Sequence, residues 1–224
     1  MDQSLREQVV EQVRSEIISG HSGPGVMYSV PSLAASLGVS TTPVREALLE
    51  LARSGLIEPM RNRGFRVIEP SLGELRNLFD LREVLEVHAV RVVARDPVRR
   101  RLDGLDALAE DIARAVRDEN VRTYLETDRR FHRALTDAAG NPLLTETIMA
   151  LRDKMRLYGI ASRSGYERQS ASVEEHVRLV DLVRRGREEE AADLLRWHIR
   201  SWEPIFAEAI TRTIRGLARE PIVR

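Results

Sequence analysis

The chain of 224 residues contains no cysteine, so neither a disulfide bridge nor a thiolate metal site can form. Its first residues are charged and hold no apolar signal-peptide core, and no apolar run approaches the length that crosses a bilayer. We therefore expect a cytoplasmic protein without a membrane partner. Because 42% of its residues are hydrophobic, the chain should bury a core rather than stay disordered.

The chain also lacks a net charge, since 35 basic side chains balance 35 acidic ones. This balance argues against a protein that binds nucleic acid through its overall charge. A DNA-binding site would depend on a local surplus, and residues 45–66 offer a mild one. In that region five arginines face three glutamates: Arg45, Arg53, Arg61, Arg63 and Arg66 against Glu46, Glu50 and Glu58.

Residues 38–48 have the pattern of a helix-turn-helix. A short helix over 32–37 ends at Gly38, and a second helix is predicted over 41–54, with Pro43 in its first turn and Arg45 on its exposed side. Such a second helix is typical of one that enters a DNA groove. Residues 57–68 alternate around Asn62-Arg63-Gly64 and predict a two-stranded basic wing.

We predict a mainly α protein of two domains. Residues 1–69, which begin with a helix over 3–19, form the winged helix-turn-helix with its small β wing, and residues 70–73 form a linker. Residues 74–224 form an all-α domain for effector binding and dimerisation, an antiparallel bundle. Capping boxes at Ser71-x-x-Glu74 and Ser172-x-x-Glu175 mark two helix starts. The helices are expected at 74–95, 103–118, 121–139, 142–163, 170–186 and 188–217.

Four polar residues fall on helix faces that should be apolar. Asp128 and His132 lie one turn apart on the inward stripe of the 121–139 helix, and His176 and His198 lie among apolar residues of two later helices. Buried polar groups need partners. Separate core hydrogen bonds would satisfy each one, and a shared divalent cation would satisfy all four, because imidazole and carboxylate suit zinc, nickel, manganese or iron.

Arg82 falls on the apolar stripe of the 74–95 helix. A guanidinium in that position suits bidentate capture of a ligand carboxylate. The alternative is a structural pair with a nearby acid such as Glu86 or Asp128.

These residues together resemble the GntR family of bacterial transcription regulators, in the FadR subfamily whose C-terminal bundle is called FCD. The N-terminal resemblance rests on Leu33-Ala34-x-x-Leu37-Gly38-Val39-Ser40, Thr42-Pro43-Val44-Arg45-Glu46-Ala47-Leu48, Gly55-Leu56-Ile57 and Asn62-x-Gly64. The C-terminal resemblance rests on Leu81-Arg82-x-x-Leu85-Glu86, Asp128-x-x-x-His132, Gly140-Asn141-Pro142-Leu143, Glu175-His176 and His198-Ile199. The spacing is similar to the metal-binding branch, and a count of six bundle helices favours its VanR-like version.

The resemblance implies a metabolite-responsive regulator, usually a repressor, that binds a near-palindromic operator as a homodimer. It implies a divalent metal, zinc above all, on Asp128, His132, His176 and His198, and a small organic acid effector anchored by Arg82. It implies DNA contacts from six residues: Ser40, Thr41, Thr42, Arg45, Arg63 and Gly64. Thr41 stands where many members have arginine, and because threonine makes no bidentate contact to guanine, a different base pattern is expected there.

Two other classes of protein share parts of this pattern. A metal-dependent hydrolase would also hold an Asp/His site, because such sites activate water, but no paired general acid or nucleophile stands beside the four residues. A dimeric DNA-binding protein with a purely structural bundle would use them only for packing. We therefore expect a regulator rather than an enzyme.

Overall fold

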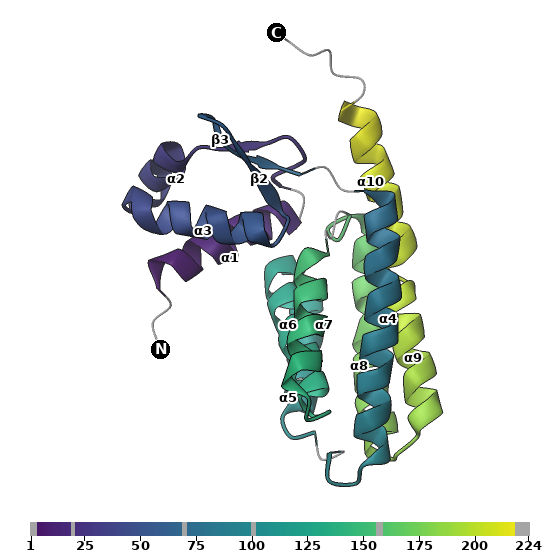
Figure 1. Cartoon of the computed structure of the whole chain (residues 1–224). Helices are drawn as coiled ribbons and strands as arrows, with labels where there is room; N and C mark the ends of the chain where they lie inside the picture. The colour runs from purple at the N-terminus through teal and green to yellow at the C-terminus, as the bar shows by residue number, and fades with distance from the viewer. Residues whose placement is uncertain (1–3, 19–20, 69–70, 100–101, 156–158, 218–224) are drawn as a thin grey trace. The chain divides into compact units, whose positions relative to one another are not determined.

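The computed structural model describes residues 4–18, 21–68, 71–99, 102–155 and 159–217. The chain divides into two compact units, whose elements are labelled in Figure 1. One consists mainly of the residues up to Leu72, and the other of Gly73–Met155 and Gly159–Ala207. Within the described residues, no helix combines the length and apolar character that a membrane crossing requires.

The first unit is a winged helix-turn-helix. Its elements are α1 (Leu5–Ile18), β1 (Met27–Tyr28), α2 (Val30–Leu37), α3 (Thr41–Arg53), β2 (Ile57–Met60) and β3 (Gly64–Val67). The three strands form an antiparallel sheet in the order β1-β3-β2. The predicted helices and the two-stranded wing are confirmed. The strand β1 was not predicted, because two residues are too short to show an alternating pattern.

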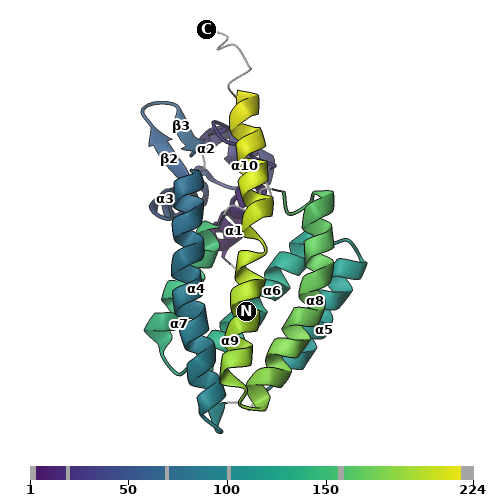
Figure 2. The same ribbon diagram turned by 90° about the vertical axis from the view of Figure 1, so that its right-hand side faces the viewer.

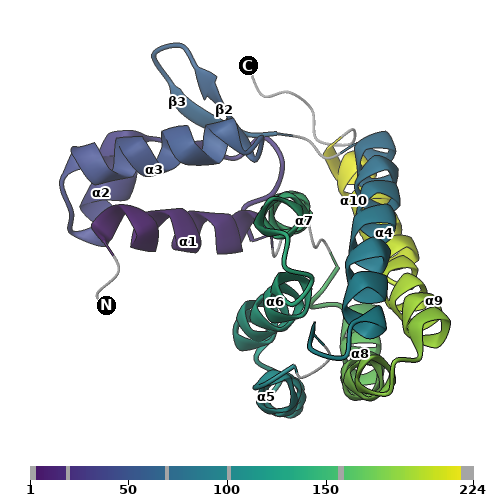
Figure 3. The ribbon, with the colours of Figure 1, turned by 60° about the horizontal axis from the view of Figure 1, so that its bottom comes forward.

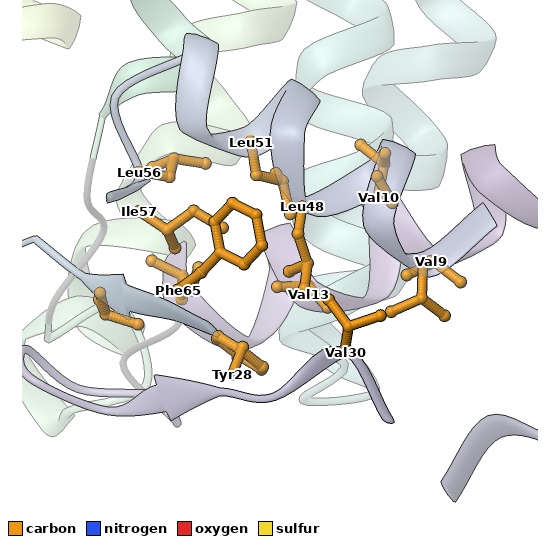
Figure 4. Packing of buried hydrophobic residues seen from close by; sticks show 14 of the residues in the cluster. Val9, Val10, Val13, Tyr28, Val30, Leu48, Leu51, Leu56, Ile57 and Phe65 are labelled. Carbon is orange, nitrogen blue, oxygen red and sulfur yellow. The ribbon is translucent and has the colours of Figure 1, made fainter. Parts of the chain in front are cut away.

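An apolar core joins the three helices to the sheet. Figure 4 shows the Phe65 ring of β3 beside Leu48 of α3 and Ile57 of β2, with Val13 of α1 close by. Each of these four side chains is buried. Because the core takes residues from every element of this unit, it fixes α3 and the wing as one body.

The turn between α2 and α3 depends on Gly38. This residue ends α2 in the left-handed region at φ 66°, where glycine bears no Cβ penalty, and the amide of Val39 donates to the Ala34 carbonyl at 3.1 Å. Ser29 caps the start of α2, whereas the Ser40 hydroxyl makes no capping bond at the start of α3. The first turn of α3 therefore presents exposed hydroxyl side chains.

The second unit contains seven helices within the described residues. They are α4 (Leu72–Arg95), α5 (Leu105–Arg117), α6 (Val121–Asp137), α7 (Pro142–Lys154), α8 (Arg163–Arg184), α9 (Glu188–Arg200) and α10 (Glu203–Leu217), the last of which continues beyond this unit. Figure 2 shows α4, α8 and α9 running alongside one another. Figure 3, which looks nearly along the bundle, separates these three from the row formed by α5, α6 and α7.

The bounds predicted for two helices, 142–163 and 170–186, and the capping box predicted at Ser172 are wrong. Helix α7 ends at Lys154, and α8 begins at Arg163, seven residues earlier than expected. The Ser162 hydroxyl caps α8 by accepting from the Gly165 amide at 3.1 Å. A Cβ at Gly165 would lie 2.3 Å from the Gly159 carbonyl oxygen, so this glycine permits close packing rather than marking a loop. Ser172 is buried inside the helix and caps nothing.

The single helix predicted over 188–217 is also wrong. Helix α9 ends at Arg200, and α10 begins at Glu203 after a turn. Pro204 explains the break, because proline fits the first turn of a new helix but not a helix interior. The bundle therefore has seven helices rather than six among the described residues, and the helix count gives no support to the VanR-like version.

Candidate metal centre and nucleic-acid interface

The bundle brings together the four residues that were predicted as metal ligands. Asp128 and His132 of α6 meet His176 of α8 and His198 of α9, with one donor atom from each lying within 4.8 Å of all the others. The three histidines are buried, and the Asp128 side chain is 15% exposed. The imidazole rings pack at centroid distances of 4.8 to 5.5 Å.

Three imidazole nitrogens in this cluster lack hydrogen-bond partners. Nε2 of His132 and both ring nitrogens of His176 are buried without a hydrogen bond. Two of them face the same carboxylate oxygen, Asp128 Oδ1, which lies 3.2 Å from His176 Nε2 and 3.6 Å from His132 Nε2. Buried nitrogens without partners are costly, so separate core hydrogen bonds do not account for these histidines.

A divalent cation fits this set of donors. Ligand atoms about 2.0 to 2.2 Å from one ion lie at most about 4.4 Å apart. The observed spread of 4.8 Å would contract by about 0.4 Å for two donors on opposite sides of an ion, and by roughly 1.2 Å for the tetrahedral arrangement that zinc prefers. Three imidazoles and a carboxylate suit zinc and its first-row neighbours.

The other oxygen of Asp128 belongs to a chain of buried ion pairs. Arg152 of α7 donates to Asp128 Oδ2 at 2.6 Å and to Glu86 Oε2 at 3.0 Å. Arg82 donates through Nε to Glu86 Oε1 at 2.7 Å. The structural pairing of Arg82 with Glu86, an alternative left open by the sequence, is thus present. The two Nη nitrogens of Arg82 have no hydrogen-bond partner among the described residues.

These neighbours set the protonation states of the cluster. Burial acts to raise the pKa of the Asp128 carboxyl, but His132 and Arg152 outweigh it and hold that pKa well below its usual range. Burial and then Arg152 hold the pKa of His132 well below its usual range. Burial lowers the pKa of His198 to about 4. At neutral pH the carboxylate is ionised and both imidazoles are neutral, which are the forms that bind a metal.

Glu175 and Arg168 complete the surroundings of His198. The Nδ1 atom of His198 lies 2.8 Å from Glu175 Oε2, and Arg168 is hydrogen-bonded to the same oxygen. Sequence reasoning missed the roles of Arg168 and Arg152. It quoted Glu175 in a capping box and in the Glu175-His176 motif, without a role at His198. Arg152 carried a readable signal, because it follows Thr145, Ile148 and Met149 on the buried face of α7, as Arg82 does on α4.

The predicted DNA-contacting residues lie at two places in the first unit. Ser40, Thr41, Thr42 and Arg45 are exposed at the head of α3, and Arg63 is exposed at the tip of the wing. Gly64 is half-buried for a structural reason, since a Cβ there would lie 2.2 Å from the Tyr28 carbonyl oxygen and its φ is 106°. The glycine therefore lets β3 approach β1 beside the tip.

Ion pairs neutralise some of the arginines in this unit and leave others unpaired. Arg66 donates to Glu58 across the wing at 2.6 Å, and Arg6 pairs with Glu50 at 3.2 Å. Four arginines make no such pair among the described residues: Arg45 and Arg53 on α3, and Arg61 and Arg63 at the wing tip. The unpaired positive charge of this unit therefore includes both arginines that are expected to contact DNA, Arg45 and Arg63.

Two family profiles match the chain, one over each unit. Residues 5–67 match the bacterial regulatory proteins of the gntR family, and residues 77–201 match the FCD domain. The chain belongs to the GntR family, with an FCD domain. It is thus a DNA-binding transcriptional regulator of the GntR/FCD type.

Individual relatives extend over nearly the whole chain. The Nta operon transcriptional regulator of Aminobacter aminovorans is 30% identical, over 92% of this chain and 95% of its own length. The transcriptional repressor NanR of Citrobacter rodentium is 31% identical, over 88% of this chain and 83% of its own length. A solved GntR transcriptional regulator from Rhodococcus sp. RHA1 has a similar fold, with a TM-score of 0.75, 24% identity and coverage of 92% and 99%.

Proposed function

We propose that this GntR/FCD regulator is a metabolite-responsive repressor whose bundle holds a divalent metal, and that a small carboxylate effector bound at this metal releases the protein from its operator. The observation that carries the proposal is the convergence of Asp128, His132, His176 and His198 with buried, unpaired imidazole nitrogens. The presence of a named repressor, NanR, among the relatives supports repression as the output.

The metal would be held by the Asp128 carboxylate and the three imidazoles, with zinc as the expected ion and nickel, manganese and iron as alternatives. When bound, the ion supplies a Lewis-acidic centre that attracts an anionic ligand. Arg152 holds Asp128 Oδ2, which leaves Oδ1 directed at the histidines. The buried rings exclude water from the donors and keep them in place.

Arg82 would anchor the effector. Its Nε is engaged by Glu86, while its Nη nitrogens remain able to donate to a ligand carboxylate. The guanidinium belongs to the same chain of ion pairs as the metal ligand Asp128, through Glu86 and Arg152. A carboxylate effector would thereby contact both the metal and a fixed cation of the protein.

The DNA-binding half would act as a homodimer on a near-palindromic operator. A single winged helix presents one recognition helix, and specific binding by such modules uses two half-sites related by the two-fold axis of the dimer. The head of α3 (Ser40, Thr41, Thr42 and Arg45) would contact base edges and phosphates, and Arg63 and Gly64 at the wing tip would contact the backbone. An effector that alters the half-site spacing of the dimer would release the DNA.

The central test measures metal content and metal-dependent release. Protein purified without chelators is expected to contain about one divalent metal per chain, and His132→Ala to contain much less. His88→Ala is the matched control, because His88 is exposed on α4 outside the cluster. Organic acids are then screened for those that weaken operator binding of the metal-loaded protein in a mobility-shift titration.

Two results would contradict the proposal in different ways. Elemental analysis that finds no metal after loading with zinc, nickel, manganese or iron would remove the metal site. Full metal occupancy combined with operator binding that no organic acid alters would leave the ion as a structural element of the bundle.

A further inference from the structure

The three histidines of the cluster differ in the group that faces the Nδ1 atom of each ring. The Nδ1 atom of His198 lies at hydrogen-bond distance, 2.8 Å, from Glu175 Oε2. The Nδ1 atom of His132 lies 3.6 Å from Glu86 Oε2, too far for a hydrogen bond. The Nδ1 atom of His176 is buried with no partner. Among the described contacts, His198 is thus the histidine whose Nδ1 atom is held by a carboxylate.

Glu175 is itself fixed in position. Arg168, one side of whose guanidinium faces the Trp202 ring at 5.5 Å, donates from Nη2 to Glu175 Oε2. The same nitrogen lies 3.4 Å from the His198 backbone carbonyl. Arg168 is buried, and the Glu175 side chain is only 13% exposed. One arginine therefore contacts both the carboxylate and the backbone of the histidine that the carboxylate orients.

A carboxylate at one ring nitrogen decides which tautomer a neutral histidine adopts. Because an ionised carboxylate only accepts hydrogen bonds, the proton of His198 must reside on Nδ1, which leaves the Nε2 lone pair free. In known metal sites such an outer carboxylate fixes the ring and raises the basicity of the ligating nitrogen.

We infer that Glu175, held by Arg168, is a positioning residue that presents His198 to the metal through Nε2 and strengthens its binding. The inference rests on the proposed metal site, but it makes its own claim, that Glu175 controls the His198 tautomer in the protein even without metal. A purely structural Glu175–Arg168 ion pair would leave the tautomer and the metal affinity unaffected.

The first experiment observes the tautomer directly in the unaltered, metal-free protein. Nitrogen NMR of the full chain labelled with ¹⁵N-histidine, at a pH where the rings are neutral, distinguishes a protonated ring nitrogen from a bare one. We expect the His198 signals to show a protonated Nδ1 and a bare Nε2. An Nε2-protonated ring, or an equal mixture of tautomers, would overturn the inference without reference to any variant.

The second experiment measures the affinity for zinc by competition with a chromophoric chelator. Glu175→Gln should raise the zinc Kd about 10- to 100-fold, because a neutral amide fixes the ring less firmly than a carboxylate. Glu174→Gln is the matched control, since Glu174 is exposed on the same helix and its loss of charge should leave the Kd unchanged. The melting temperature of each metal-free variant reports whether the bundle still folds.

The outcomes separate the inference from the proposed function. A zinc Kd for Glu175→Gln within twofold of that for Glu174→Gln, with both variants folded, would overturn the positioning role. If Glu175→Gln does not fold, the tautomer in the unaltered protein decides the question. Failure of the unaltered protein to bind zinc would instead contradict the proposed metal site.

Discussion

Because His198 is held neutral in the folded protein, the free energy of unfolding decreases as the pH falls. Burial lowers the pKa of His198 to about 4, although the hydrogen bond with Glu175 acts in the opposite direction. In the unfolded chain the same ring titrates near its ordinary pKa of about 6.5. Between these two values the unfolded state binds more protons than the folded state, so folding becomes less favourable as the pH falls.

We expect the free energy of unfolding of the metal-free protein to decrease between about pH 6.5 and pH 4 by on the order of 3 kcal/mol from His198. His132 adds to the decrease, because its pKa is also lowered. Denaturant titrations at pH 7, 6 and 5 measure the effect above the range in which carboxylates titrate.

His198→Gln should flatten this pH dependence, whereas His88→Gln, which alters an exposed ring on α4, should not change it. Equal slopes for His198→Gln and the unaltered protein would show that His198 does not carry the effect.

Asp128, His132, His176, His198 and Arg82 could be predicted as buried from the sequence, because each interrupts an apolar stripe of helical period. The pairing of Arg82 with Glu86 was one of the alternatives that the sequence left open, but the other partners could not be predicted in the same way. Arg152 contacts residues 24 and 66 positions away in the sequence, and Arg168 contacts the His198 carbonyl, 30 positions away. Contacts between different helices leave no mark on the helical period of either one. Which acid pairs with which base is decided by the packing of the bundle.

In the wing, an ion pair between the two strands determines which basic side chains remain free to contact DNA. Glu58 of β2 and Arg66 of β3 are directly opposite in the strand register, and the arginine donates two hydrogen bonds to one carboxylate oxygen. Such exposed pairs contribute little stability, about 0 to 1 kcal/mol. Their larger effect is to remove a cation from the surface that would contact phosphate.

Glu58→Gln should therefore tighten binding to DNA of any sequence, by releasing Arg66 for a phosphate. Each added phosphate contact steepens the dependence of log K on log salt by up to about 0.9. Titration of a fluorescent duplex at several salt concentrations measures both changes.

Glu167→Gln provides the control, because it frees Arg163 in the same manner on α8 of the bundle, 3.0 Å from its present partner. If the two variants change the salt dependence equally, the wing has no special part in DNA binding.

The predicted helix boundaries agree with the structure where a capping residue or a glycine turn sets the boundary. Gly38 ends α2. The Asn141 side chain caps the start of α7 by accepting from the Leu144 amide at 3.2 Å, and Pro142 stands in the first turn, where a proline is tolerated. The boundaries failed where a residue served tertiary packing. Gly165 falls between the helices predicted over 142–163 and 170–186, yet it lies in the first turn of α8. A glycine is required there because the backbone of 159–160 leaves no room for a Cβ. No local pattern reports that approach.

The two units divide the work of a regulator between separate cores. The core of the winged helix is built from residues between Val9 and Val67, and the Asp/His cluster lies entirely within α6, α8 and α9. Substitutions that affect one function should therefore leave the other intact.

Arg45→Ala and His132→Ala should show opposite losses. Arg45→Ala should abolish binding to an operator selected from random duplex DNA, because it removes an exposed cation at the head of α3, while its zinc content stays normal. His132→Ala should lose zinc and still bind operator. Mobility-shift titration and elemental analysis of both proteins check the pair.

Retention of operator affinity by Arg45→Ala would contradict the assignment of α3 as the recognition helix. Loss of zinc by the same variant would contradict the independence of the two units.

The ion pairs around Asp128 also bear on how metal and effector would influence each other's binding. Arg82, Glu86, Arg152 and Asp128 carry two positive and two negative charges in sequence, so the set is electrically neutral. A divalent cation would add two positive charges in a setting with little water to screen them. An anionic effector would offset those charges, and the cation in turn would attract the effector. By linkage, each would raise the affinity for the other by the same factor, so the protein would sense the simultaneous presence of metal and metabolite rather than either one alone.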